Sequence, residues 1–153
     1  MPTNLLTAVR EIGTIELMDA PSGINTPTSL ALWLQTQPEA ATNHTLRVLS
    51  SETSKWERLP LETFQKIAHV EPPSTNSQHW DAFIEAITAK RLHNRGLSAP
   101  EWTRKTSLEE NWNPYAEANP HTAPIQDFWD MIHTTPEFIE KAIIYPQQDL
   151  VNL

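Results

Sequence analysis

The sequence predicts an all-α, single-domain protein with about six short helices joined by proline-rich connections. Segments with apolar residues at helical spacing outnumber segments with two-residue alternation. Thirteen prolines against three glycines favour short helices whose starts and ends are set by proline. With 39% apolar residues, the chain can bury one core, so we expect residues 1–153 to form one domain. The predicted helical stripes lie at 5–12, 30–34, 61–68, 80–92 and 125–132.

The clearest of these helices lies in the segment 77–112, which also holds the most distinctive aromatic and proline positions. Ser77 is a good N-cap, and Gly96 is a good stop signal. Between them, one apolar stripe is expected to face the core. The stripe consists of Trp80, Phe83, Ile84 and Ile87.

In the N-terminal half, prolines and polar residues mark the expected helix boundaries. Thr26 and Pro27 form an N-cap and first-position pair for the helix that runs to Leu34. Residues 39–50 are compatible with a further helix that ends at the polar stretch 51–54. We expect Pro60 to occupy the first position of the next helix.

The C-terminal half is more irregular. Residues 97–113 predict a packed segment with at most one helical turn, and residues 113–124 predict a proline-rich loop. A last short helix is expected to start at Thr135 and Pro136. Residues 142–145 are compatible with one short extended segment.

Composition and motifs exclude several classes of function. The chain has no cysteine and no glycine-rich phosphate-binding motif, so we expect no disulfide, thiol nucleophile or nucleotide cofactor. A net charge of −8 argues against sequence-specific DNA binding by the chain alone. Neither a signal peptide nor a membrane span is recognisable, and we expect a cytoplasmic protein.

No catalytic or metal site can be identified from the residues. The six histidines lack the spacing of known metal motifs. Glu109 and Glu110 could pair with Glu85 or Asp81 as acid and base, although carboxylates in an acidic chain more often form a solvated face. The six tryptophans could form a stacking site, but core packing is the favoured interpretation.

Charge is unevenly distributed along the chain. Residues 90–105 carry five cations and one acid, whereas residues 106–153 carry eight acids and one lysine. The basic stretch could bind a phosphate or an acidic group beside Trp102. The favoured alternative is that these cations cap helix ends and pair with the acidic C-terminal third.

The C-terminal third is a candidate protein-binding surface, because its apolar end is too short to bury a face of its own. Folding back onto the same chain is an equally acceptable alternative. The apolar part comprises Phe138, Ile143, Ile144, Tyr145, Leu150 and Val151. The predicted interaction patch consists of Arg95, Trp102, Arg104, Lys105, Phe138, Ile144 and Tyr145.

Several spaced aromatic and proline positions resemble a module of uncharacterised actinobacterial proteins. They are Trp80, the run 95–102 (RGLSAPEW), Leu108, the run 112–114 (WNP), and the segment from Thr135-Pro136-Glu137-Phe138 to Leu150. The resemblance covers roughly residues 59–153 and is strongest over 77–153. Proteins with this module resemble antitoxins or regulators, in which it stands alone or behind an Xre-like helix-turn-helix. Residues 1–60 lack such a motif, so this chain resembles the stand-alone form.

Two classes of function are therefore carried forward. The preferred one is a non-catalytic, antitoxin-like interaction or regulatory module that binds a protein partner or forms a homodimer. The alternative is a small cytoplasmic enzyme whose carboxylate or histidine site is not recognisable from the sequence.

Overall fold

The computed structural model describes residues 21–121 and 124–146, and these form an all-α fold. The predicted helix at 5–12 lies outside the described residues, as do Leu150 and Val151. Short 3₁₀ turns occur at η1 (Lys55–Arg58) and η2 (Glu101–Arg104). The α-helices within the described ranges are α2 (Pro27–Leu34), α3 (Asn43–Ser54), α4 (Leu61–His69), α5 (Gln78–Asn94), α6 (Pro114–Ala118), α7 (Pro124–Ile132) and α8 (Pro136–Ile139).

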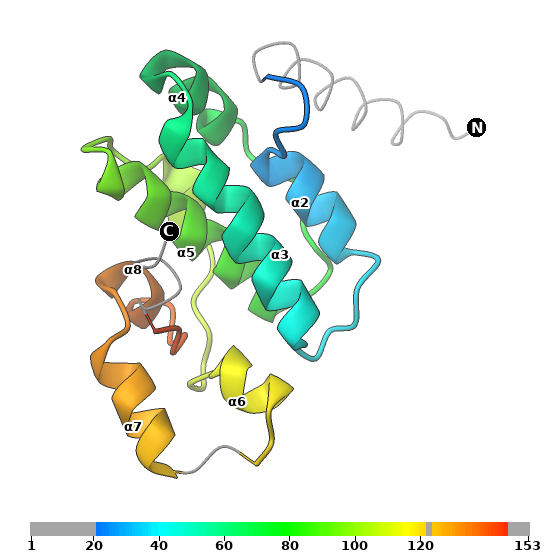
Figure 1. Ribbon diagram of the computed structural model, residues 1–153, viewed down its shortest axis with the longest axis vertical. Helices are drawn as coiled ribbons and strands as arrows, with labels where there is room; N and C mark the ends of the chain where they lie inside the picture. The colour runs from blue at the N-terminus through cyan, green and yellow to red at the C-terminus, as the bar shows by residue number, and fades with distance from the viewer. Residues whose placement is uncertain (1–20, 122–123, 147–153) are drawn as a thin grey trace.

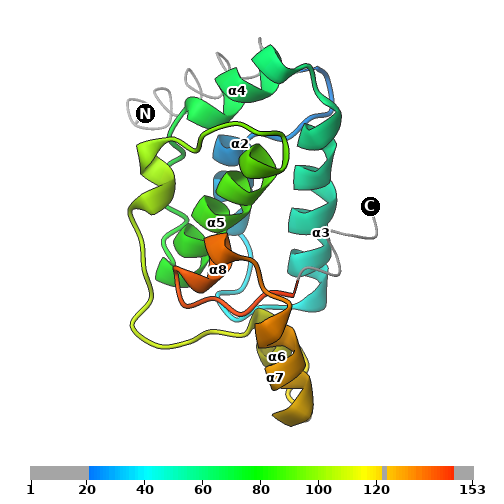
Figure 2. The same cartoon turned by 90° about the vertical axis from the view of Figure 1, so that its left-hand side faces the viewer.

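Helix α5 is the centre of the fold. It contacts α2, α3, α4, α8 and both 3₁₀ turns, which surround it on several sides (Figure 1). Helix α4 lies at one end of the molecule, whereas α6 and α7 both lie toward the opposite end (Figure 2). None of the described helices is long and apolar enough to cross a membrane.

The predicted boundaries of α5 are confirmed, but its predicted single apolar stripe is too narrow. The Ser77 side chain accepts a hydrogen bond from the Trp80 backbone N–H at 3.3 Å, and Gly96 ends the helix region at a φ of +74°. The helix also buries Glu85, Thr88 and Arg91. Surrounding helices cover α5 on most sides, so its polar residues are buried together with the apolar ones.

Capping explains where the other helices start. The Thr26 side chain accepts a hydrogen bond from the Ser29 backbone N–H at 3.2 Å, and Pro27 takes the first helical position as predicted. Pro60 is the N-cap of α4 instead of its first residue. The stretch 51–54 forms the last turn of α3, which ends at Ser54 and leads directly into η1. The Thr53 and Ser54 hydroxyls donate to the carbonyls of Leu49 and Ser51 within the helix, so these polar side chains are satisfied locally.

The predicted loop 113–124 contains a helix that the sequence interpretation missed. Asn113 accepts a hydrogen bond from the Ala116 backbone N–H at 3.0 Å, and Pro114 takes the first position of α6. An asparagine followed by proline is the same type of start signal as Thr26 and Pro27. Helix α6 is too short for its apolar residues to show a helical period in the sequence.

The predicted last helix is present, whereas the segment 142–145 is extended only in part, because Ala142 lies in a turn with a φ of +65°. The backbone N–H of Trp112 donates to Ala142 O at 2.8 Å, and that of Ile144 donates to Trp112 O at 2.8 Å. These bonds form an isolated parallel bridge between Trp112 and Ile143. The segment after α8 therefore folds back against the chain beside Trp112.

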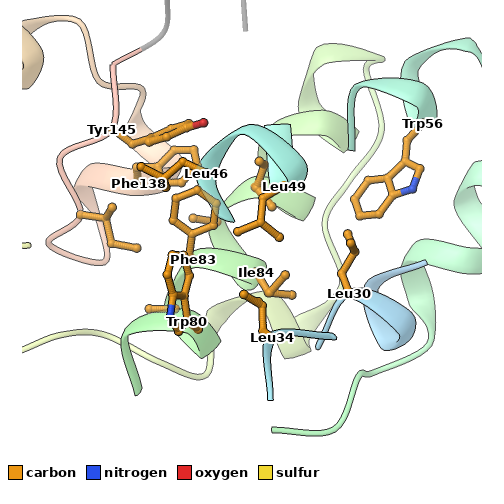
Figure 3. Packing of buried hydrophobic residues seen from close by; sticks show 14 of the residues in the cluster. Leu30, Leu34, Leu46, Leu49, Trp56, Trp80, Phe83, Ile84, Phe138 and Tyr145 are labelled. Carbon is orange, nitrogen blue, oxygen red and sulfur yellow. The ribbon is translucent and has the colours of Figure 1, made fainter. Parts of the chain in front are cut away.

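An aromatic cluster joins α5 to this returning segment. The Phe83 ring lies 5.3 Å from the Phe138 ring and 5.0 Å from the Tyr145 ring, measured between centroids (Figure 3). Trp80 and Trp112 extend the cluster, with their ring centroids 5.1 Å apart. Edge-on contacts of this kind add to the free energy gained by burying the rings.

The expectation that tryptophans fill the core holds for most of them. Trp56, Trp80, Trp102 and Trp112 are buried. Three of these indole N–H groups donate to main-chain carbonyls, namely those of Asn25, Glu39 and Ala68. Trp129 differs, because 36% of its surface is exposed.

Replacing Phe83 with alanine should destabilise the fold strongly. Phe83 is fully buried and its ring contacts four other aromatic rings, so the cavity should lower the free energy of unfolding by about 3–5 kcal/mol. Urea unfolding followed by circular dichroism measures the change. Leu61→Ala on the exposed side of α4 is the control and should cost no more than about 0.5 kcal/mol. Equal losses for the two variants would contradict the central place of Phe83.

Candidate functional site

The apolar members of the predicted interaction patch are mostly inside the protein. Phe138 and Tyr145 are completely buried, and Trp102 is 6% exposed. Ile144 is partly buried, and its backbone is held against Trp112. The described part of the apolar C-terminal segment therefore packs on the same chain, as in the alternative that the sequence left open. The Phe138 and Tyr145 rings pack against Phe83 in the aromatic cluster, so they are not exposed to a partner.

The basic members of the patch hold local structure together. The Arg95 guanidinium donates to Trp56 O at 2.9 Å and to Leu59 O at 2.6 Å. Arg104 donates to Ala99 O at 3.1 Å, and the Lys105 ammonium pairs with the carboxylate of Glu71. These contacts agree with a structural role for the basic stretch, although the partners lie outside the acidic C-terminal third.

Arg91 is a buried cation that joins α5 to α3 and η1. Its guanidinium donates to Thr53 Oγ1 at 3.1 Å, to Ser50 O at 3.0 Å and to a Glu57 carboxylate oxygen at 2.7 Å. Burial lowers the pKa of Arg91, while the hydrogen bond and charge of Glu57 oppose that shift. Each of the three guanidinium nitrogens donates a hydrogen bond within the fold, so Arg91 is a structural residue.

A second buried ion pair joins α5 to the C-terminal segment, and nothing in the sequence pattern indicated it. Lys141 Nζ lies 2.7 Å from Glu85 Oε1 and 2.8 Å from Thr106 O, and both charged side chains are 8% exposed. Thr106 donates to Glu85 through its backbone N–H at 2.8 Å and its hydroxyl at 2.6 Å. Glu85 and Lys141 are separated by 56 residues, so only the folded chain brings them together.

A cavity of about 130 Å³ lies beside this ion pair. Three carboxylates line it together with Trp102 and two prolines. Asp81 accepts hydrogen bonds from Ser74 and Thr75, Glu85 accepts from Thr106 and Lys141, and Glu71 accepts from Lys105. All three acids are thus engaged by the chain itself. Glu109 and Glu110, proposed as possible acid–base partners, do not line this cavity.

A more open hollow of about 630 Å³ lies between the end of α5 and α8. His93 Nδ1 lies 2.6 Å from Glu137 Oε2 on its wall. Burial tends to raise the pKa of Glu137, but hydrogen bonds, led by the one with His93, lower it below its ordinary value. Among the described residues, no group of three or more histidine, aspartate or glutamate side chains could hold a metal ion.

The exposed apolar residues form the most distinctive surface feature. Five large apolar side chains are exposed among the described residues, and four of them lie between positions 129 and 139. We call these four, together with the helices that carry them, the α7–α8 face. It consists of Trp129, Met131, Ile132 and Ile139, which are 36%, 41%, 58% and 46% exposed.

Polar contacts near the C-terminal end of α7 attach this helix to the rest of the fold. Asp130 is 3% exposed and accepts hydrogen bonds from Gln126 at 2.9 Å and Asn113 at 3.3 Å. The Thr134 hydroxyl donates to Asp130 O at 2.7 Å and accepts from the Tyr145 backbone N–H at 2.9 Å. Helix α7 is therefore oriented by polar contacts on one side, while Trp129 and Ile132 remain at the surface.

The sequence predicted the helix at 125–132, and the favoured interpretation of the tryptophans placed Trp129 in the core. Trp129 and Ile132 belong to the apolar stripe of this helix, and both are exposed. One feature of the sequence indicates this exposure. The helix lies between two proline-containing connections in the acidic C-terminal third, where few other apolar segments could cover it. Helical spacing reveals an apolar side, but it does not identify what covers that side.

Comparisons with protein-family models, curated proteins and solved structures returned no match for this chain. The function must therefore be inferred from the geometry of its own residues.

The Glu85–Lys141 pair should behave as a coupled unit. Lys141→Met should lower the free energy of unfolding by about 3–5 kcal/mol, because it leaves the Glu85 carboxylate buried without its cation. Glu85→Leu should cost a similar amount. The double variant should lose less than the sum of the single losses, by about 1–3 kcal/mol, in urea unfolding at neutral pH. Strict additivity would show that the pair contributes no coupling.

Stability should fall in alkaline solution because of Tyr145. Burial raises the pKa of its phenol from 10.0 to about 12, so the folded chain holds this proton more tightly than the unfolded chain. The contribution is complete below pH 10 and is lost as pH rises through about 12. Urea unfolding across this range should show a steeper fall for the native sequence than for Tyr145→Phe. Parallel curves would rule out this source of pH dependence.

Proposed function

We propose that this chain is a non-catalytic protein-interaction module that binds a partner protein through the α7–α8 face. The observation that carries the proposal is the concentration of exposed apolar side chains on this face. Elsewhere in the described residues, only Leu61 on α4 is a large exposed apolar side chain. Scattered single residues of that kind are normal, whereas a cluster at one end of a molecule typically marks a binding surface.

The residue types on the face suit protein binding. Tryptophan and methionine are enriched at protein interfaces, and tryptophan often supplies a large share of the binding energy. Trp129 is oriented by stacking on His133, with ring centroids 4.0 Å apart and an interplanar angle of 26°. A partner would thus meet an ordered indole ring and would bury Ile132, which follows it by three residues on α7.

The enzyme alternative has less support. Each carboxylate in the smaller cavity already accepts hydrogen bonds from the chain, and the larger hollow is open to solvent. Histidines are likewise engaged: His79 stacks on Trp112, and His93 pairs with Glu137. These contacts favour structural roles for the groups over a role as general base in an enclosed site.

A regulatory, antitoxin-like role in the cytoplasm is the context that the resemblance implies. Trp80, Trp102 and Trp112, which carry part of that resemblance, pack in the core. The resemblance therefore bears on a shared fold and gene context, and the α7–α8 face supplies the binding function. A net charge of −8 makes a protein partner more favourable than DNA.

Ile132→Glu tests the proposal. A charge at the most exposed apolar position of the face should weaken binding roughly tenfold or more, while the fold and urea stability stay unchanged. The partner is first identified by co-purification from the native host, and its affinity for purified native and variant chains is then measured by calorimetry.

Leu61→Glu is the matched control, because Leu61 is 50% exposed on α4, away from α7 (Figure 2). It should bind the partner as the native chain does. The proposal fails if both variants bind equally well. It also fails if light scattering finds a homodimer that Ile132→Glu converts to a monomer, because the face would then be occupied by a second copy.

A further inference from the structure

We propose that His133 is a pH-sensitive switch on α7. In acidic solution its ring places a positive charge against Trp129 and weakens the binding of uncharged apolar groups there. The proposal rests on the proposed function, because Trp129 and Ile132 belong to the α7–α8 face, and it adds a means of regulating that face. The contacts that carry it lie within α7 and the residue that follows it.

Two contacts hold the His133 ring on Trp129. The ring centroids lie 4.0 Å apart with an interplanar angle of 26°, and His133 Nδ1 lies 2.8 Å from Trp129 O. A carbonyl oxygen only accepts hydrogen bonds, so Nδ1 carries a hydrogen and Nε2 is the nitrogen that gains or loses a proton. Titration of His133 therefore changes the charge beside Trp129 without removing either contact.

No acid among the described residues pairs with the His133 ring. His133 is exposed and forms no ion pair in the described part of the chain. The acids on its own helix are Asp127 and Asp130, and the Asp130 carboxylate is buried and accepts hydrogen bonds from two amide side chains. The acids on and directly after α8 are Glu137, which pairs with a histidine of α5, and Glu140, which is exposed.

The segments that contact the C-terminal end of α7 add no charge through their contacts. They meet it through the Asn113 side chain and through the Tyr145 backbone N–H. The Tyr145 phenol stays neutral where histidine titrates, between about pH 5 and 8, because burial raises its pKa to about 12. His121 precedes the other end of α7, and the nine residues of that helix span about 14 Å.

A charged His133 ring disfavours the burial of its neighbours under apolar atoms. His133 and Ile132 follow Trp129 by four and three residues, so they flank it on the helix surface. An uncharged group that covers the indole also displaces water from the His133 ring, and dehydrating an imidazolium costs far more free energy than dehydrating a neutral imidazole. Binding therefore favours the neutral ring, so the affinity is complete above about pH 8 and is lost as the pH falls toward about 5.

Tryptophan fluorescence tests whether the charge reaches Trp129. A protonated imidazole in contact with an indole quenches the emission of that indole. The difference between the native chain and Trp129→Phe isolates this signal from the other tryptophans, including Trp112, on which His79 stacks. The isolated emission should fall by roughly half or more between about pH 8 and pH 5, and His133→Gln should abolish the fall.

His69→Gln is the matched control. His69 Nδ1 lies 2.7 Å from Gln65 O at the C-terminal end of α4, in the same arrangement as His133 with Trp129 O. None of the ring contacts among the described residues involves His69. The quenching of Trp129 should therefore persist in His69→Gln.

Nile red, an uncharged apolar dye, tests whether the switch controls access to the surface. The purified full chain should bind the dye at least roughly threefold more weakly at about pH 5 than at about pH 8. His133→Gln should remove this pH dependence and keep the binding, whereas Ile132→Glu should weaken binding at both pH values.

The outcomes separate the switch from the proposed function. Dye binding that is independent of pH but is lost in Ile132→Glu would retain the face and overturn the switch. Unchanged Trp129 emission, a change that persists in His133→Gln, or the absence of dye binding at both pH values would also overturn it. A natural partner that binds Ile132→Glu as well as the native chain would instead overturn the proposed function, even if His133 quenches Trp129 as expected.

Discussion

The burial of α5 on most of its sides is the constraint on which the rest of the structure depends. A helix that is covered in this way must find partners for its polar residues as well as its apolar ones. Glu85 is matched by Lys141 and Thr106, and Arg91 is matched by Glu57, Thr53 and Ser50. Each of these contacts holds a segment that is distant in sequence against α5, because a buried charge without a partner would destabilise the fold.

The same constraint explains why the C-terminal third divides into an inner and an outer part. Phe138 and Tyr145 complete the aromatic cluster around Phe83, and Lys141 completes the ion pair with Glu85. These contacts place α8 and the returning segment against α5. Helix α7 precedes them and is attached through the hydrogen bond of Asn113 to Asp130, and its side chains Trp129, Met131 and Ile132 are exposed.

Charge follows a similar division. The buried cations Arg91 and Lys141 are paired within the fold, whereas Glu109, Glu110 and Glu140 are exposed and form no ion pair among the described residues.

The sequence by itself determined the all-α class, the position of α5 and the caps at Thr26 and Ser77, because helical periodicity and capping act over a few neighbouring residues. It also indicated that most tryptophans would be core residues. Only the tertiary structure decided that Phe138 and Tyr145 turn inward while Trp129 and Ile132 face outward. Both pairs are apolar and both lie on or beside short helices, so local pattern cannot distinguish them. Their difference arises from contacts across more than fifty residues, such as Phe83 with Phe138 and Glu85 with Lys141.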